Sequence, residues 1–119
     1  LYGREGAPVL VFVHGGGWTA GAPGDYAFVA RPLAALGWRV AVPGYRLHPA
    51  VSFPTFVDDV ARACATLDGP LVLMGHSAGA FIAAALAYDP RWGLRARTRG
   101  FIGLAGPYDF QAREANPPA

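Results

Sequence analysis

Residues 71–80 read LVLMGHSAGA, and they place a serine between two glycines directly after an apolar run. The four opening apolar residues have the length of a buried strand, and residues 78–86 carry Ala, Phe, Ile and Leu at helical spacing. The G-x-S-x-G stretch therefore joins a strand to a helix. Such a sharp turn requires glycine at positions 75 and 79, where a side chain would strike a neighbouring element. We expect Ser77 to project from the end of the sheet at the N-terminus of the helix, whose amides and dipole favour negative charge.

Three further apolar runs predict the rest of the sheet: VLVFV at 9–13, VAV at 40–42 and FIGL at 101–104. A helical pattern lies between the first two runs, in residues 25–37, where Pro32 either kinks or starts the helix and Gly37 closes it. A second pattern follows Pro54. Strands that alternate with helices predict an α/β fold with a mostly parallel sheet of about four strands, flanked by helices. We expect residues 1–119 to belong to a single domain.

The stretch HGGGW, residues 14–18, also follows a strand directly. Consecutive glycines let backbone amides approach a bound oxygen, which a tetrahedral intermediate requires. The glycines at 15, 17 and 21 also approach a dinucleotide fingerprint, which expects an acidic residue at the end of the next strand. Pro43 and Gly44 stand there instead, and Pro23 interrupts the helix that the fingerprint needs. The glycines therefore favour an oxyanion loop, and no cofactor is expected.

Composition limits the other classes of function. The net charge is +2, and all ten basic residues are arginine. The basic stretch at 91–99 is interpreted as a solvated connector, so no nucleic-acid partner is expected. No run of about 18 apolar residues predicts a membrane span. Cys64 is the sole cysteine and is expected in the core, and no metal site is expected. A cytoplasmic location is expected, although the chain starts at Leu1 and an upstream signal could have been lost.

The chain resembles the α/β-hydrolase superfamily, on the esterase and lipase side that includes hormone-sensitive-lipase-like enzymes. The resemblance rests on VFVHGGGW, YRLHPAVSFP at 45–54 followed by two aspartates, GHSAGAFIAA, and GLAGPYD at 103–109. The HGGxW pattern also resembles the arylformamidases. The resemblance implies that the first and third strands are neighbours, with the second and fourth outside them.

The resemblance also implies site residues. Ser77 would be the nucleophile, and the oxyanion-hole amides would come from Gly16, Gly17 and Ala78. His14 and Gly15 would support the loop. A serine nucleophile needs a histidine base that a carboxylate orients, and in this family both follow the serine.

None of the three histidines of this chain follows the serine. We expect His76 to pack against the sheet and His48 to lie on the surface, in a connector loose enough to swing. Asp109 is the candidate acid at the end of the fourth strand, whereas Asp89 and Glu114 are interpreted as a helix end and a tail.

The expected function is a serine hydrolase that cleaves small carboxylic esters through an acyl-enzyme on Ser77. The alternatives are an arylformamidase-like amide hydrolase and a non-catalytic, truncated or degenerate hydrolase. The chain is expected to be a fragment that lacks the C-terminal strands with the acid and the base, and to be inactive alone. The expected partner is a small-molecule ester or amide, and the oligomeric state is left open.

Overall fold

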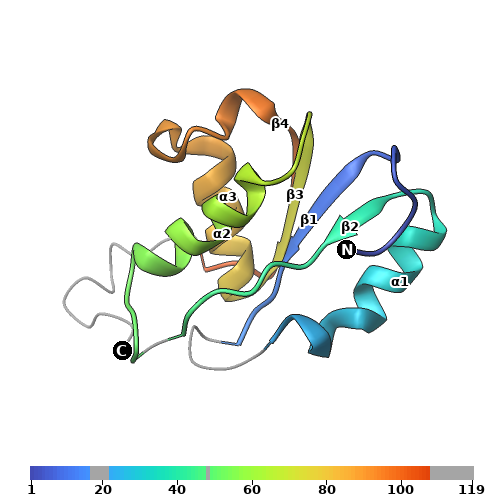
Figure 1. Ribbon diagram of the computed structural model, residues 1–119. Coiled ribbons are helices and arrows are strands. Elements are labelled where there is room, and N and C mark those ends of the chain that lie inside the picture. The colour runs from blue at the N-terminus through green and yellow to red at the C-terminus, as the bar shows by residue number, and fades with distance from the viewer. Residues whose placement is uncertain (17–21, 48, 108–119) are drawn as a thin grey trace.

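The computed structural model describes residues 1–16, 22–47 and 49–107, and it contains a four-stranded parallel sheet with helices on both faces (Figure 1). The strand order is β2-β1-β3-β4, which confirms the predicted arrangement. Parallel pairing joins each neighbouring pair. The strands are β1 (Val9–Val13), β2 (Arg39–Ala41), β3 (Leu71–His76) and β4 (Thr98–Leu104).

Helix α1 covers one face of the sheet, and helices α2 and α3 cover the other (Figure 1). Three short 3₁₀ turns lie in the described parts of the connections: η1 precedes α1, and η2 and η3 lie between α3 and β4. The predicted alternation of strands and helices is confirmed. The bounds are η1 (Pro23–Tyr26), α1 (Ala27–Ala35), α2 (Thr55–Ala65), α3 (Ala78–Tyr88), η2 (Pro90–Trp92) and η3 (Arg95–Arg97).

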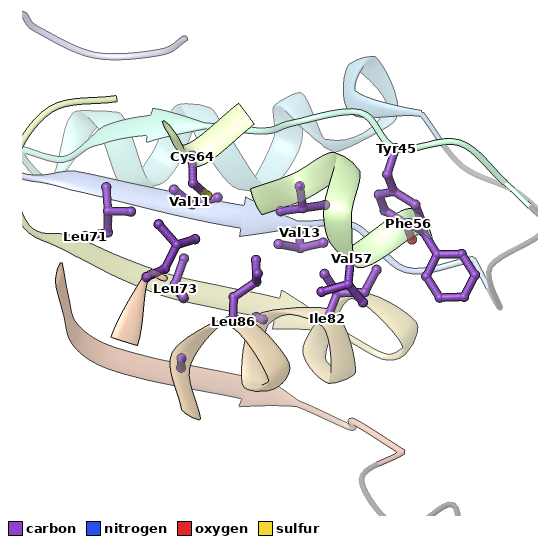
Figure 2. Close-up of a cluster of buried hydrophobic side chains, with 14 of the residues drawn as sticks. Val11, Val13, Tyr45, Phe56, Val57, Cys64, Leu71, Leu73, Ile82 and Leu86 are labelled. Atoms are coloured by element: carbon purple, nitrogen blue, oxygen red, sulfur yellow. The ribbon is translucent and has the colours of Figure 1, made fainter. Parts of the chain in front are cut away.

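The core has two layers because successive residues of β1 point to opposite faces of the sheet. Val11 and Val13 pack with α2 and α3, whereas Leu10 and Phe12 pack on the side of α1. All four are at most 1% exposed, which explains why β1 is a continuous apolar run. Figure 2 shows the larger cluster, where Cys64 is fully buried as predicted. Burial raises the pKa of its thiol to about 11.

The structure decides the alternative left open at Pro32, and it moves the start of one strand. Pro32 lies inside α1, so it does not start the helix, while Gly37 follows the helix at φ 107° and donates its amide to Ala34, as a closing glycine does. Strand β4 begins at Thr98, before the apolar run that predicted it. Its first residues pair with β3, but Arg99 is exposed, so hydrophobicity alone does not reveal this part of the strand.

The basic stretch at 91–99 is not simply a solvated connector, and that interpretation is wrong for Arg97. Its Nε donates to the Gly69 carbonyl at 2.9 Å and one terminal nitrogen donates to the Cys64 carbonyl at 3.3 Å. The other terminal nitrogen donates to the Leu67 carbonyl. A guanidinium with several donors is well suited to the carbonyls at and just beyond a helix C-terminus, and Arg97 therefore fixes the end of α2.

Candidate active site

The turn between β3 and α3 holds Ser77 in an unusual backbone conformation, with φ 55° and ψ −120°. A non-glycine residue in such a sparsely populated region costs on the order of 1–3 kcal/mol, so the surrounding structure must hold it. The Ser77 amide donates to the Leu104 carbonyl at the end of β4, at 2.8 Å, and the Ser77 carbonyl accepts from the Ala80 amide, at 2.9 Å. The turn is thus tied to β4 on one side and to α3 on the other.

Glycine is required on both sides of the turn, as the sequence predicts. A Cβ atom at Gly75 would stand 2.3 Å from the carbonyl oxygen of Gly79. A Cβ atom at Gly79 would stand 2.0 Å from the carbonyl oxygen of Val13 and 2.5 Å from that of His14. Helix α3 therefore starts almost in contact with the end of β1, and this close approach brings the serine turn to the glycine loop.

The described part of the glycine loop, residues 14–16 after β1, lies against the serine turn, residues 75–79 between β3 and α3. A Cβ atom at Gly15 would lie 2.7 Å from the His76 carbonyl oxygen and 3.1 Å from the Cβ atom of Ser77. Both motifs follow the carboxyl ends of neighbouring parallel strands, which meet at one edge of the sheet. The two stretches that the sequence singled out thus lie side by side.

The three candidate oxyanion donors are described to different extents. Gly16 lies beyond Gly15 in the loop with φ 124°, a conformation that favours glycine. Ala78 opens α3 and is 1% exposed, and a first-turn amide has no acceptor within its own helix. Gly17 lies outside the described residues.

His14 is fully buried beneath the glycine loop. Its Nδ1 donates to the Gly15 carbonyl at 2.8 Å, and its ring stacks on the rings of Tyr45, at 4.4 Å, and Tyr26, at 5.5 Å. The Tyr45 hydroxyl donates to the His14 carbonyl at 2.8 Å, and burial raises the pKa of this phenol, which keeps it protonated as a donor. The sequence did not identify Tyr26 and Tyr45 as supports, because both act across large separations in the chain.

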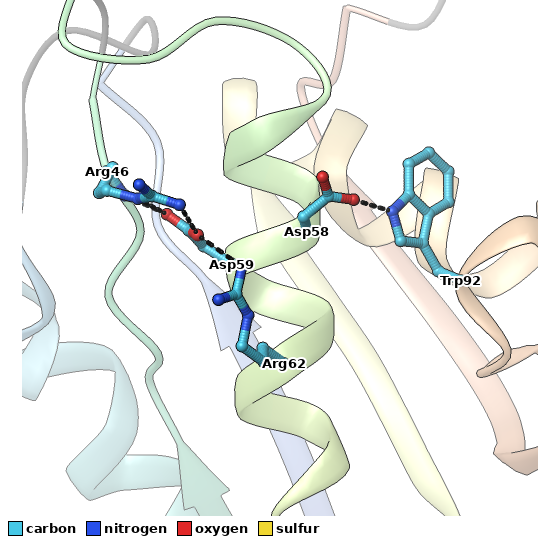
Figure 3. A network of polar contacts seen from close by, with 5 residues as sticks. All are labelled: Arg46, Asp58, Asp59, Arg62 and Trp92. Atoms are coloured by element: carbon cyan, nitrogen blue, oxygen red, sulfur yellow. Dashed lines mark hydrogen bonds and ion pairs between the residues drawn. The ribbon is translucent and has the colours of Figure 1, made fainter.

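The connector at 45–54 is anchored to α2 by an ion pair (Figure 3). The Asp59 carboxylate accepts from Arg46 three times, from the backbone amide at 2.9 Å, from Nε at 3.0 Å and from a terminal nitrogen at 2.9 Å. The hydrogen-bonded guanidinium lowers the pKa of Asp59. Arg62 lies 3.5 Å from the same carboxylate, and neighbouring Asp58 accepts from the Trp92 indole at 2.6 Å. Both aspartates of the family-like segment thus have structural partners.

His76 does not pack against the sheet, and that prediction is wrong. The residue is exposed at the end of β3, where its neighbour in register, Leu104, is 42% exposed. Helix α1 contacts β2, which lies at the opposite edge of the sheet from β4. Within the described part of the chain, no hydrogen bond joins the Ser77 hydroxyl to His14 or His76.

The remaining candidate acids and bases fall into two groups. His48, Asp109 and Glu114 lie outside the described residues. Asp89 ends α3 and caps the next turn by accepting from the Arg91 amide at 3.0 Å, which confirms its interpretation as a helix end. Over the described ranges, no three His, Cys, Asp or Glu residues gather as metal ligands, and no helix is long and apolar enough to cross a membrane.

A groove of about 730 Å³ lies at the opposite end of the sheet, between the N-terminal segment and the starts of β2 and β3. Its lining includes Trp38, Arg39, Asp68 and Arg99. The described lining residues include no serine, cysteine or histidine, and the Thr66 hydroxyl among them donates to the Ala63 carbonyl at 2.7 Å. The groove therefore offers no nucleophile with a histidine beside it.

The comparison with protein families matches residues 10–116 to a family described as having the alpha/beta hydrolase fold. The carboxylesterase NlhH of Mycobacterium tuberculosis is 35% identical over 95 residues, which cover 71% of this chain and 30% of that protein. The kynurenine formamidase of Danio rerio is 30% identical over 112 residues, which cover 87% of this chain and 38% of that protein. An FAD-linked oxidoreductase of Aspergillus terreus, pytB, is 39% identical over 103 residues, or 81% of this chain and 13% of that protein.

Among solved structures, a fungal esterase of Rhizomucor miehei superposes with a TM-score of 0.74 and 25% identity. The superposition covers 91% of this chain and 38% of that one. The chain thus spans less than half the length of each of these relatives.

Proposed function

The chain belongs to the alpha/beta hydrolase fold family, and on that premise we propose that Ser77 is the nucleophile of a serine hydrolase that cleaves carboxylic esters of small molecules. The observation that supports this most is the strained Ser77 backbone, packed against Gly15 at the end of the sheet. Backbone strain that the surroundings maintain at such a cost is typical of functional positions. A turn used only to connect β3 to α3 has no need of it.

The proposed reaction has two halves. The Ser77 oxygen attacks the acyl carbon as a base removes its proton, and the carbonyl oxygen becomes an oxyanion. The amides of Gly16, Gly17 and Ala78 donate to this oxyanion, where each donor is worth roughly 10²- to 10³-fold in rate. The intermediate expels the alcohol, which takes the proton, and water then releases the acid and regenerates the serine.

The general base is the part that the described residues do not supply. His14 has its Nδ1 committed to the Gly15 carbonyl, and neither it nor His76 bonds to the Ser77 hydroxyl. His48 remains a candidate within the chain. With no base at all, the rate would not exceed the roughly 10³- to 10⁴-fold over water that oxyanion donors and binding sustain alone.

A second candidate reaction is hydrolysis of N-formyl aromatic amides, because this chain is similar to a kynurenine formamidase as well as to a carboxylesterase. Both reactions use the same serine and the same oxyanion donors. They differ in the leaving group, since an amine must be protonated before it departs whereas an activated alcohol leaves more easily. The choice between them depends on the acid that delivers the proton.

The test follows acylation of the protein by p-nitrophenyl acetate and by N-formyl aromatic amides, with Ser77→Ala as the control. Peptide mass mapping is expected to place the acyl group on Ser77, and the variant is expected to lose the adduct and any turnover above background. The ratio of kcat/KM for the two substrate classes separates esterase from formamidase. In a form of the protein that carries a base, equal rates for wild type and Ser77→Ala with no adduct would contradict the proposal and favour a non-catalytic member of the family. His48→Ala tests that residue as the base within this chain.

A further inference from the structure

Four aromatic rings form a continuous row along the C-terminal end of the sheet. The Tyr45 ring lies 6.4 Å from Phe56, and Phe56 lies 6.3 Å from Phe53. Phe53 in turn lies 5.8 Å from Phe81. All three pairs have tilted or edge-on geometry within the range where aromatic rings attract one another.

The row connects the two halves of the candidate site. Its first member, Tyr45, holds the glycine loop through the His14 carbonyl, and Figure 2 shows Tyr45 and Phe56 near the arrowheads of β1 and β3. Its last member, Phe81, lies one helical turn after Ser77, and its amide approaches the Ser77 carbonyl at 3.4 Å. Long side chains on a helix lean toward its N-terminus, so the Phe81 ring leans toward the serine turn.

Burial separates these rings into two kinds. Tyr45 is 8% and Phe56 is 5% exposed, so both are explained by the core. Phe81 is half-buried, and Phe53 exposes 48% of its surface although two other rings hold it in place. A packing role does not explain why Phe53, held between two other rings in a row that leads to the serine turn, leaves nearly half of its surface exposed. Apolar and aromatic walls with a few polar groups are the usual composition of small-molecule sites.

We propose that Phe53 and Phe81 form an aromatic wall of the substrate site, and that the substrates carry a phenyl-sized apolar group next to the scissile carbonyl. The inference rests on the proposed function, since it places this group relative to Ser77. The ring of the substrate packs on the open face of Phe53 while the carbonyl lies between the serine and the oxyanion donors. Substrates with only a methyl or ethyl group at this place lose that contact.

The experiment measures equilibrium binding of two ketones that resemble esters but cannot be hydrolysed, phenylacetone and butanone, by ligand-observed NMR. Wild-type protein and Ser77→Ala are both expected to bind phenylacetone more tightly than butanone. Phe53→Ala is expected to weaken phenylacetone binding about threefold to tenfold, the range expected for one aromatic contact, and to leave butanone unchanged. Phe53→Leu, which keeps apolar bulk and protects the packing on Phe56, is expected to fall between wild type and Phe53→Ala.

The matched control is Tyr88→Ala. Tyr88 is also an exposed aromatic residue, at 65%, and its ring contacts that of Phe101 at 5.7 Å, whereas Phe53 contacts two rings. It lies at the last turn of α3, away from the serine turn, so its removal is expected to leave both affinities unchanged. Thermal unfolding of each variant verifies that the fold is retained.

The outcomes separate the two proposals. If Phe53→Ala and Phe53→Leu both bind phenylacetone as wild type does, or if wild type does not prefer phenylacetone, the aromatic wall is refuted, whatever the hydrolysis assay shows. An equal loss of binding in Tyr88→Ala also refutes it, because the effect is then not local. Failure of Ser77 acylation in a form of the protein that carries a base refutes the proposed function and leaves the ketone measurements interpretable, because binding requires no nucleophile.

Discussion

A methyl group added at Gly79 tests the packing that holds the serine turn in place. The Cβ atom of Gly79→Ala would stand 2.0 Å from the Val13 carbonyl oxygen and 2.5 Å from that of His14. Real Cβ contacts are essentially never shorter than 3.0 Å, so α3 and β1 must separate by about 1 Å. Both obstacles are backbone atoms, and neither can rotate out of the way.

The magnitude follows from overpacking in a close-packed interior. Inserting one methylene typically costs about 1–3 kcal/mol, and the rigid backbone contacts place this case near about 3 kcal/mol. In a domain of this size that corresponds to a fall in Tm on the order of 10 °C. The displacement also moves Ser77 away from the Gly15 loop, and a misplacement of about 1 Å costs on the order of 10²-fold in rate.

Thermal and urea unfolding, followed by circular dichroism, measure the first effect, and the rate of Ser77 acylation measures the second. The control is Gly24→Ala, because a Cβ atom there meets nothing within 4 Å. Its free energy of unfolding should stay within about 0.5 kcal/mol of wild type. A Gly79→Ala protein with wild-type stability and acylation would show that α3 does not start against β1, and the close approach argued above would be wrong.

Three further predictions concern the supports of the fold. Asp59→Asn is expected to lower stability near neutral pH, because Arg46 holds the pKa of Asp59 below its ordinary 3.8 in the folded chain. The deficit is expected to shrink as pH falls through that lowered pKa, where the carboxylate is protonated and its contribution is lost; urea titrations at several pH values measure it, and a deficit that is constant with pH would contradict it. Arg97→Lys should destabilise by about 1–2 kcal/mol, because an ammonium group cannot reach three carbonyls at once, whereas Arg95→Lys should be neutral in the same urea titration. Cys64 should react with iodoacetamide at pH 8 at least about 100-fold more slowly in the folded chain than in urea, because its thiol is buried and its pKa is raised to about 11; comparable rates would place it outside the core.

The fold and the serine turn could be predicted because their signals are local. Strand β1 is five consecutive apolar residues, and the turn at Ser77 must have glycine on both sides because Gly75 packs against Gly79 and Gly79 packs against the end of β1. Each of these constraints is written within a short stretch of chain, so one sequence suffices to find it. The strand order came from resemblance to a family, because hydrophobic patterns do not specify which strands are neighbours.

The supports of the site could not be predicted because they join distant residues. Tyr45 holds the His14 carbonyl across 31 positions, and Arg97 reaches carbonyls 28 to 33 positions away. In the sequence, Arg97 is one of several arginines in a polar stretch and Tyr45 is one aromatic residue in a connector. What distinguishes each from its neighbours is the backbone carbonyls that it meets, and only folding brings those carbonyls within reach.

The same distinction explains why the nucleophile is easier to infer than the base. Ser77 can adopt its strained backbone conformation because glycine stands two positions before it and two positions after it. The role of Ser77 can therefore be recognised from adjacent residues. A histidine base needs only to bring one ring nitrogen within hydrogen-bond distance of the serine oxygen, and any loop that ends near the turn can supply it. The position of such a histidine therefore depends on how distant segments come together in the fold. It imposes no local requirement for glycine or for a particular turn. His14 illustrates the limit, since it is adjacent to the site in both sequence and space, yet its hydrogen bond to the Gly15 carbonyl and its stacking on Tyr45 commit it to the loop.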